Sequence, residues 1–179
     1  MQENLTKNEI NKFKEDGAIL LKSKFDQNWI EKLKKGIDKD IKNPSPRFKS
    51  HTKKNGIPAY LEDYWTWDVV PEFKDFVFNS PYSKIASELM SSKKINLVID
   101  NWFLREARSK SAAPFHHDIT YFDIEGTMCV LWLPLESLKR TLKKSLFHKC
   151  EPLTQAIPSF FFKGSNGSQR THIVPSISK

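Results

Sequence analysis

The chain has 179 residues, of which 39% are hydrophobic and 12% aromatic, and its formal net charge is +8 at pH 7. This is enough for one hydrophobic core and too little for two ordinary domains. The excess charge lies at one end: residues 1–136 hold 21 basic and 20 acidic residues, whereas residues 137–179 hold eight basic residues and one acidic residue. We therefore expect no nucleic-acid partner.

The sequence also argues against a membrane protein or a disulfide-stabilised protein. No apolar run approaches the roughly 20 residues of a membrane-spanning helix, and the opening residues MQENLTKNE lack the apolar core of a secretion signal. The cysteines are Cys129 and Cys150, too few for a disulfide framework, and Cys129 is predicted to be a buried thiol within an apolar run. We expect a cytoplasmic protein without a membrane partner.

The first elements in chain order are two helices joined by a strand. Thr6 and Glu9 have the spacing of a capping box, and Gly17 is a suitable end for the helix that they begin. The apolar run at residues 18–21 is typical of a short buried strand. Asp26 then caps a second helix, whose apolar stripe recurs at spacings of three and four: Ile30, Leu33, Ile37 and Ile41.

The middle of the chain combines a polar loop, an aromatic segment and a third helix. Residues 43–57 contain prolines and a glycine and predict a loop in which His51 is a surface residue. Residues 60–67 concentrate aromatic side chains, which favours a role in the core or in a pocket wall. Ser80 and Pro81 predict the start of a helix, and two strands are expected at residues 95–104 and 127–135.

The segment between these strands carries the residues best suited to chemistry. It reads Pro114-Phe115-His116-His117-Asp118. In extended backbone, residues two apart point to one side, so His116 and Asp118 would present an imidazole and a carboxylate together. They are two of the three ligands of a two-histidine, one-carboxylate iron site, whereas His116 and His117 would diverge. From the residues alone, a polar turn between strands is the alternative.

Several segments in order resemble the phytanoyl-CoA dioxygenase family of iron(II)/2-oxoglutarate oxygenases. They span about residues 5–138 and are Leu5-Thr6, Asp16-Gly17, Asp75-Phe76-Val77-Phe78-Asn79-Ser80-Pro81, Pro114-Phe115-His116-His117-Asp118 with Tyr121, and Leu131-Trp132-Leu133-Pro134-Leu135. Family members usually have Trp where Phe115 stands and Gln where His117 stands. Both differences flank the proposed ligands without removing them.

The resemblance implies an α+β fold in which helices pack on a double-stranded β-helix, a jelly-roll barrel. It implies that His116 and Asp118 bind Fe(II), that 2-oxoglutarate is the cosubstrate, and that dioxygen is consumed as a substrate carbon is hydroxylated. Arg105 stands where the family often has a lysine facing the cosubstrate, and a surface arginine at a strand end is the alternative. Trp132 is expected to form barrel wall rather than to contact the cosubstrate.

The family pattern ends near residue 138, where a distal histidine and an arginine should still follow. His172 is one candidate for the third iron ligand, His148 is another, and a site without a third protein ligand is the remaining possibility. No arginine follows His172. A looser alignment assigns Arg170 to the 2-oxoglutarate carboxylate and leaves the histidine position near Phe162. Neither alignment supplies both residues.

We therefore expect a phytanoyl-CoA dioxygenase-like region at residues 1–138 and an atypical basic tail at residues 139–179. A truncation or a shifted reading frame would explain the tail. A β-helix with so few strands would be incomplete at its C-terminal end, and its open edges would favour self-association. The expected function is hydroxylation of a small-molecule or acyl substrate. The alternative is a catalytically incomplete family member that acts as a binding or partner-dependent protein.

Overall fold

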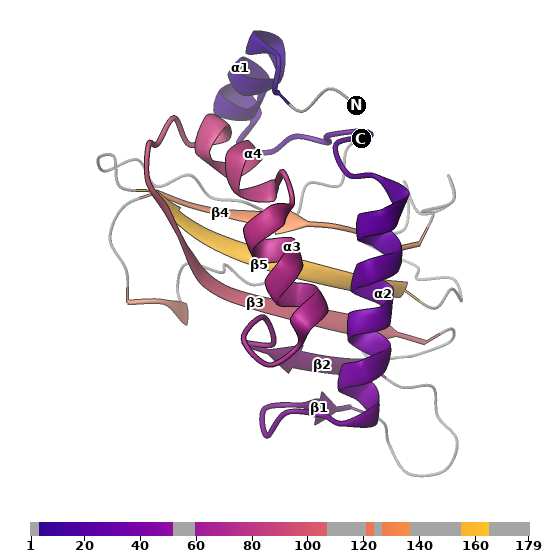
Figure 1. Cartoon of the computed structure of the whole chain (residues 1–179). Helices are drawn as coiled ribbons and strands as arrows, with labels where there is room; N and C mark the ends of the chain where they lie inside the picture. Colours follow the sequence, from indigo (N-terminus) through magenta and orange to yellow (C-terminus); the bar gives the residue numbers. More distant parts are fainter. Residues whose placement is uncertain (1–3, 52–59, 107–120, 124–126, 137–154, 165–179) are drawn as a thin grey trace.

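The computed structural model describes residues 4–51, 60–106, 121–123, 127–136 and 155–164. Its elements in chain order are α1 (Lys7–Asp16), α2 (Gln27–Lys42), β1 (Lys49–Ser50), β2 (Tyr60–Tyr64), α3 (Pro71–Asn79), α4 (Tyr82–Leu89), β3 (Ile95–Arg105), β4 (Thr127–Trp132) and β5 (Gln155–Gly164). Figure 1 shows α2 and α3 lying across one face of the sheet. No helix in these ranges is long and apolar enough to cross a membrane.

The five strands form one antiparallel sheet in the order β1-β2-β3-β5-β4. The strand β5 lies within the basic tail at residues 139–179. It pairs with β3 from Arg105↔Gln155 to Ile95↔Gly164 and with β4 from Thr127↔Gly164 to Trp132↔Ser159. The described residues combine helices with an antiparallel sheet, whereas the α+β fold with a double-stranded β-helix that is incomplete at its C-terminal end stays a prediction.

The helix caps predicted from sequence are confirmed. The Thr6 hydroxyl accepts a hydrogen bond from the Glu9 amide at 3.1 Å, and the Glu9 carboxylate accepts one from the Thr6 amide at 2.7 Å. Gly17 ends α1 with a φ of 72°, the left-handed conformation that glycine adopts without a steric penalty. Asp26 caps α2 by accepting a hydrogen bond from the Trp29 amide at 3.0 Å.

The apolar stripe of α2 packs onto the sheet and α3 as predicted. Leu33 and Ile37 are buried in the main core, and Ile30 and Ile41 pack at its edge. Gly36 lies where α2 meets α3, because a Cβ added there would be 2.7 Å from a ring carbon of Phe73. This glycine is therefore needed for the close approach of the two helices.

Two predictions about the helices and strands were wrong or incomplete. Residues 18–21 are not a strand; Ile19 and Leu21 pack against the core beside the helices, and Leu20 is 57% exposed. The helix α3 was not predicted. It begins with Pro71 at its first turn and buries Phe73, Phe76 and Val77, which have the spacing of one helix face, but it is only nine residues long. The predicted third helix is α4, and the predicted strands are β3 and β4.

The centre of the core combines Trp102 with three buried carboxyl groups. Trp102 is fully buried, packs against Phe48 and donates a hydrogen bond from Nε1 to Asp40 Oδ2 at 2.9 Å. Because Asp40 belongs to α2 and Trp102 to β3, this bond joins the helix layer to the sheet. Asp63 and Asp100, 0% and 2% exposed, lie on β2 and β3.

The carboxylates of Asp63 and Asp100 accept hydrogen bonds from residues in neighbouring turns. Asp63 accepts hydrogen bonds from the amide and the hydroxyl of Ser45, at 3.1 and 2.7 Å, and Asp100 accepts them from the amide and the hydroxyl of Thr66, at 3.1 and 2.8 Å. Burial raises the pKa of Asp40 to about 7, against the bond from Trp102, and the charges of Asp63 and Asp100 add to the rise. Burial likewise raises the pKa of Asp100 to about 6.

The substitution Trp102→Phe is expected to lower the free energy of unfolding by about 3 kcal/mol, because it removes buried volume and leaves Asp40 without its donor. Urea denaturation measures this change. The matched control is Trp65→Phe at an indole that is 48% exposed, with an expected cost of about 0.5 kcal/mol. Equal costs for the two variants would contradict the role assigned to Trp102.

Stability should also depend on pH through Asp40. Between pH 3.8, its ordinary pKa, and about 7, the unfolded chain releases the Asp40 proton while the folded protein keeps it. The contribution of Asp40 to the free energy of unfolding therefore falls as the pH rises through this window. The variant Asp40→Asn should become more stable relative to wild type at the upper end of the window, as measured by urea denaturation midpoints. Asp38→Asn, at an exposed position on the same helix, should show no such trend.

Candidate functional site

The sheet has two chemically different faces. Trp102 and Leu104 of β3 point toward the helices, so the alternating residues Asn101, Phe103 and Arg105 lie on the other side. We call this other side the distal face. Register and side-chain contacts assign ten residues of the described strands β2, β3 and β4 to it: Tyr60, Glu62, Tyr64, Ile99, Asn101, Phe103, Arg105, Met128, Val130 and Trp132.

Aromatic rings cross the distal face in a row. The rings of His51 and Tyr60 are 5.2 Å apart, those of Tyr60 and Phe103 are 6.1 Å apart, and those of Phe103 and Trp132 are 5.5 Å apart. The ends of the row are accessible, because the side chain of His51 is 42% exposed and Trp132 is 39% exposed. We call these four rings the aromatic row.

Glu62 fixes two of its neighbours on the distal face. Its Oε1 lies 3.0 Å from His51 Nε2, and its carboxylate is a hydrogen-bond partner of the Tyr64 side chain. The Glu62 side chain is 11% exposed, so these contacts are made largely away from solvent. Burial raises the pKa of the Tyr64 phenol well above its usual range, and the hydrogen bond with Glu62 and its charge add to the rise.

Arg105 ends β3 on the same face, opposite Tyr60 in the register. Its Nε atom is buried. Burial and the charge of Glu62 raise the pKa of Tyr60 to about 12, whereas the charge of Arg105 opposes the rise. The Asn101 Oδ1 atom is buried too and has no hydrogen-bond partner in the described part of the chain. A partly buried guanidinium beside aromatic rings can bind a carboxylate through two parallel hydrogen bonds.

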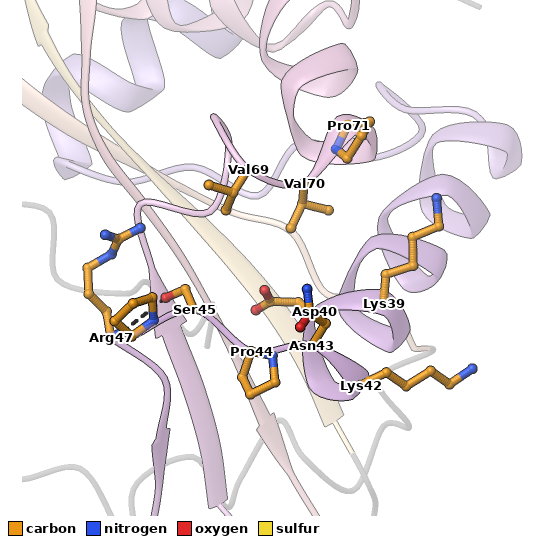
Figure 2. A pocket seen from close by; sticks show the side chains of 11 residues that line it. Lys39, Asp40, Lys42, Asn43, Pro44, Ser45, Arg47, Val69, Val70 and Pro71 are labelled. Carbon is orange, nitrogen blue, oxygen red and sulfur yellow. Dashed lines mark hydrogen bonds between the residues drawn. The ribbon is translucent and has the colours of Figure 1, made fainter.

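A cavity of about 570 Å³ lies elsewhere, between the end of α2 and the turn before α3 (Figure 2). Lys39 and Arg47 line it and are both engaged. Lys39 pairs with Glu72, and Arg47 donates to the carbonyl oxygens of Tyr64 and Trp65 at 2.8 and 2.9 Å. The cavity therefore lies beside structural contacts, on the helix side of the sheet.

Most of the predicted site residues lie outside the described residues. These are His116, Asp118, His148, Arg170 and His172. Within the described ranges, no three His, Cys, Asp or Glu side chains are grouped so that they could hold a metal ion. Cys129 is a buried free thiol, as predicted, and burial raises its pKa to about 12. Among the predicted residues, the structure describes Arg105 and Trp132, and it places both on the distal face.

A comparison with known protein families shows to which family the chain belongs. The model of the phytanoyl-CoA dioxygenase (PhyH) family matches residues 13–141, which is more than half of the chain. The chain belongs to the phytanoyl-CoA dioxygenase family. No curated protein matches its sequence. The matched range includes Arg105, His116 and Asp118 and ends before Arg170 and His172.

Membership of the phytanoyl-CoA dioxygenase family indicates an oxygenase in general terms. The resemblance seen in the sequence is thereby confirmed, with a match that begins eight residues later and ends three residues later than expected. Sequence reasoning predicted His51 as a surface residue, and the residue is exposed, but it missed Glu62 and the contact between the two side chains. The alternation Tyr60-x-Glu62-x-Tyr64 is a period-two signal that places these three side chains on one face of a strand.

The substitution Glu62→Gln is expected to lower the pKa of Tyr64 while leaving it above the ordinary value, because burial, the larger cause, remains. Difference absorbance of the phenolate during an alkaline titration measures this change. Glu31→Gln, at an exposed position on α2, is the matched control and should leave the tyrosine titration unchanged. An unchanged titration in Glu62→Gln would contradict the contact between Glu62 and Tyr64.

Proposed function

We propose that this chain is an iron(II)- and 2-oxoglutarate-dependent oxygenase that hydroxylates a small-molecule or acyl substrate. The observation that supports it most is the family match over residues 13–141, which covers the His116-His117-Asp118 segment. In this proposal His116 and Asp118 hold the metal, and His172 is the candidate third ligand. Bound iron(II) supplies the oxidising chemistry, in which dioxygen and 2-oxoglutarate are consumed and succinate is released.

The described residues fit the cosubstrate at Arg105. Its guanidinium has a buried Nε atom and lies on the distal face, where desolvation strengthens a charge-assisted hydrogen bond. A dicarboxylate such as 2-oxoglutarate carries the complementary charge. Arg105 then binds and orients one carboxylate, and the aromatic side chains around it limit the access of water. Arg170 is the candidate partner for the other carboxylate.

Formation of succinate from 2-oxoglutarate with added ferrous iron tests this function. Wild type should produce succinate, and His116→Ala and Asp118→Ala should abolish the activity. Absence of turnover in wild type would contradict the proposal and would favour the catalytically incomplete protein. The activity of wild type and the variants should be compared at matched folded fractions, measured by circular dichroism.

Arg105→Ala should raise the KM for 2-oxoglutarate by about 10- to 100-fold, because a charged hydrogen bond contributes about this factor to binding. The effect on kcat should be smaller. Arg105→Lys should restore part of the affinity, because it keeps the charge and loses the two parallel bonds. Lys42→Ala, at an exposed position beside the cavity on the helix side, is the control. An unchanged KM in Arg105→Ala would show that Arg105 does not bind the cosubstrate.

A further inference from the structure

One group of residues on the distal face extends beyond the cosubstrate site proposed above. It consists of His51, which directly follows β1, the carboxylate of Glu62, and the rest of the aromatic row. The row extends from the edge of the sheet at β1 to β4, and Arg105 is paired with one of its members, Tyr60. A ligand on the row would therefore lie beside the proposed cosubstrate.

The bond with Glu62 determines what His51 can offer a ligand. A carboxylate accepts hydrogen bonds, so Nε2 of His51 carries the proton in the pair, and Nδ1 of a neutral ring is an acceptor. If the ring is doubly protonated, Nδ1 becomes a donor instead. A hydroxyl group fits both states, because it can donate or accept. The 42% exposure of the side chain leaves His51 accessible to such a group.

The charge next to His51 disfavours an anionic head group. Glu62 is in hydrogen-bond contact with the ring, and its side chain is only 11% exposed, so its charge is weakly screened. Lys49 lies over the ring of Tyr64, with Nζ 5.4 Å from the centroid, and Arg105 is assigned to the cosubstrate. The remaining members of the row, Tyr60, Phe103 and Trp132, offer ring faces and edges to an apolar body.

We propose that the aromatic row binds the primary substrate and that His51, oriented by Glu62, is its specificity-determining residue. The substrate class is an uncharged molecule with a ring-bearing apolar body and a hydroxyl group that hydrogen-bonds to His51. The inference rests on the proposed function only in calling this ligand a substrate. The proposal of a binding site is supported by the contacts and the exposure of these side chains.

Three probes of matched shape test the proposal by ligand-observed NMR titration of the full chain without iron and with excess 2-oxoglutarate, so that Arg105 is not available to the carboxylate of a probe. Phenethyl alcohol has the ring and the hydroxyl, ethylbenzene lacks the hydroxyl, and phenylacetate carries a carboxylate in its place. Wild type should bind phenethyl alcohol about fivefold more tightly than ethylbenzene, because one neutral hydrogen bond contributes about this factor to the affinity. It should bind phenylacetate most weakly.

Variants test the His51–Glu62 pair and the aromatic rings of the row separately. His51→Phe keeps a ring against Tyr60 and should abolish the preference for the alcohol over ethylbenzene. Glu62→Gln should improve the binding of phenylacetate relative to the alcohol. Trp132→Ala should weaken all probes, whereas Trp65→Ala and Glu31→Gln, at exposed positions outside the row, should change none of these affinities. If His51→Phe does not fold by circular dichroism, His51→Ala replaces it.

Three results would overturn the inference: no binding of phenethyl alcohol, equal affinities for the alcohol and phenylacetate in wild type, or a preference for the alcohol that survives in the His51 variant. The outcome is separable from the proposed oxygenase activity. The expected binding pattern without succinate formation would leave a ligand site on a protein that is not an active oxygenase. Succinate formation without the pattern would remove only the substrate assignment.

Discussion

The hydrogen bond from Trp102 to Asp40 is the constraint on which the two layers depend. It joins α2 to the central part of the sheet through atoms that solvent does not reach. An indole donates and cannot accept, so the register between helix and strand must bring an acceptor to this point. Ser45 and Thr66 then satisfy the other two buried carboxyl groups from adjoining turns, so polar contacts specify how these turns meet the sheet.

This arrangement separates structural polar groups from those available for binding. On the helix side, the carboxyl groups of Asp40, Asp63 and Asp100 are satisfied by hydrogen bonds within the protein. On the distal face, by contrast, Arg105 and His51 lie beside aromatic rings with part of each side chain accessible. On β3, Asp100 and Arg105 belong to opposite faces, because successive residues of a strand point to opposite sides of the sheet. Substitutions on the two faces should therefore affect different properties of the protein.

The sequence was sufficient to predict the features that local chemistry determines. It was insufficient to predict those that depend on contacts between distant parts of the chain. The capping box of Thr6 and Glu9, the Gly17 end of α1 and the stripe of α2 are local signals, and they are confirmed. Residues 18–21 were assigned to a strand from their composition, although burial against helices satisfies them equally well. The position of β5 depends on partners about 30 to 70 residues away, which periodicity does not encode.

The residues of the candidate site likewise divide into those that were predicted from the sequence and those that were not. The role of Arg105 and the family were inferred from ordered motifs, and the family is confirmed. The pairing of His51 with Glu62 was not inferred, because it depends on the register of β1 against β2, in which Lys49 lies opposite Glu62. His116 and Asp118 stay predictions from the sequence.

The place of β5 in the sheet also constrains the order of folding. It lies between β3 and β4, so these two strands gain a common neighbour only when residues 155–164 have been synthesised. Until then β3 and β4 each expose an edge that could pair with other chains. During synthesis on the ribosome, the helices and the antiparallel pair of β2 and β3 can therefore form before β5 joins the sheet.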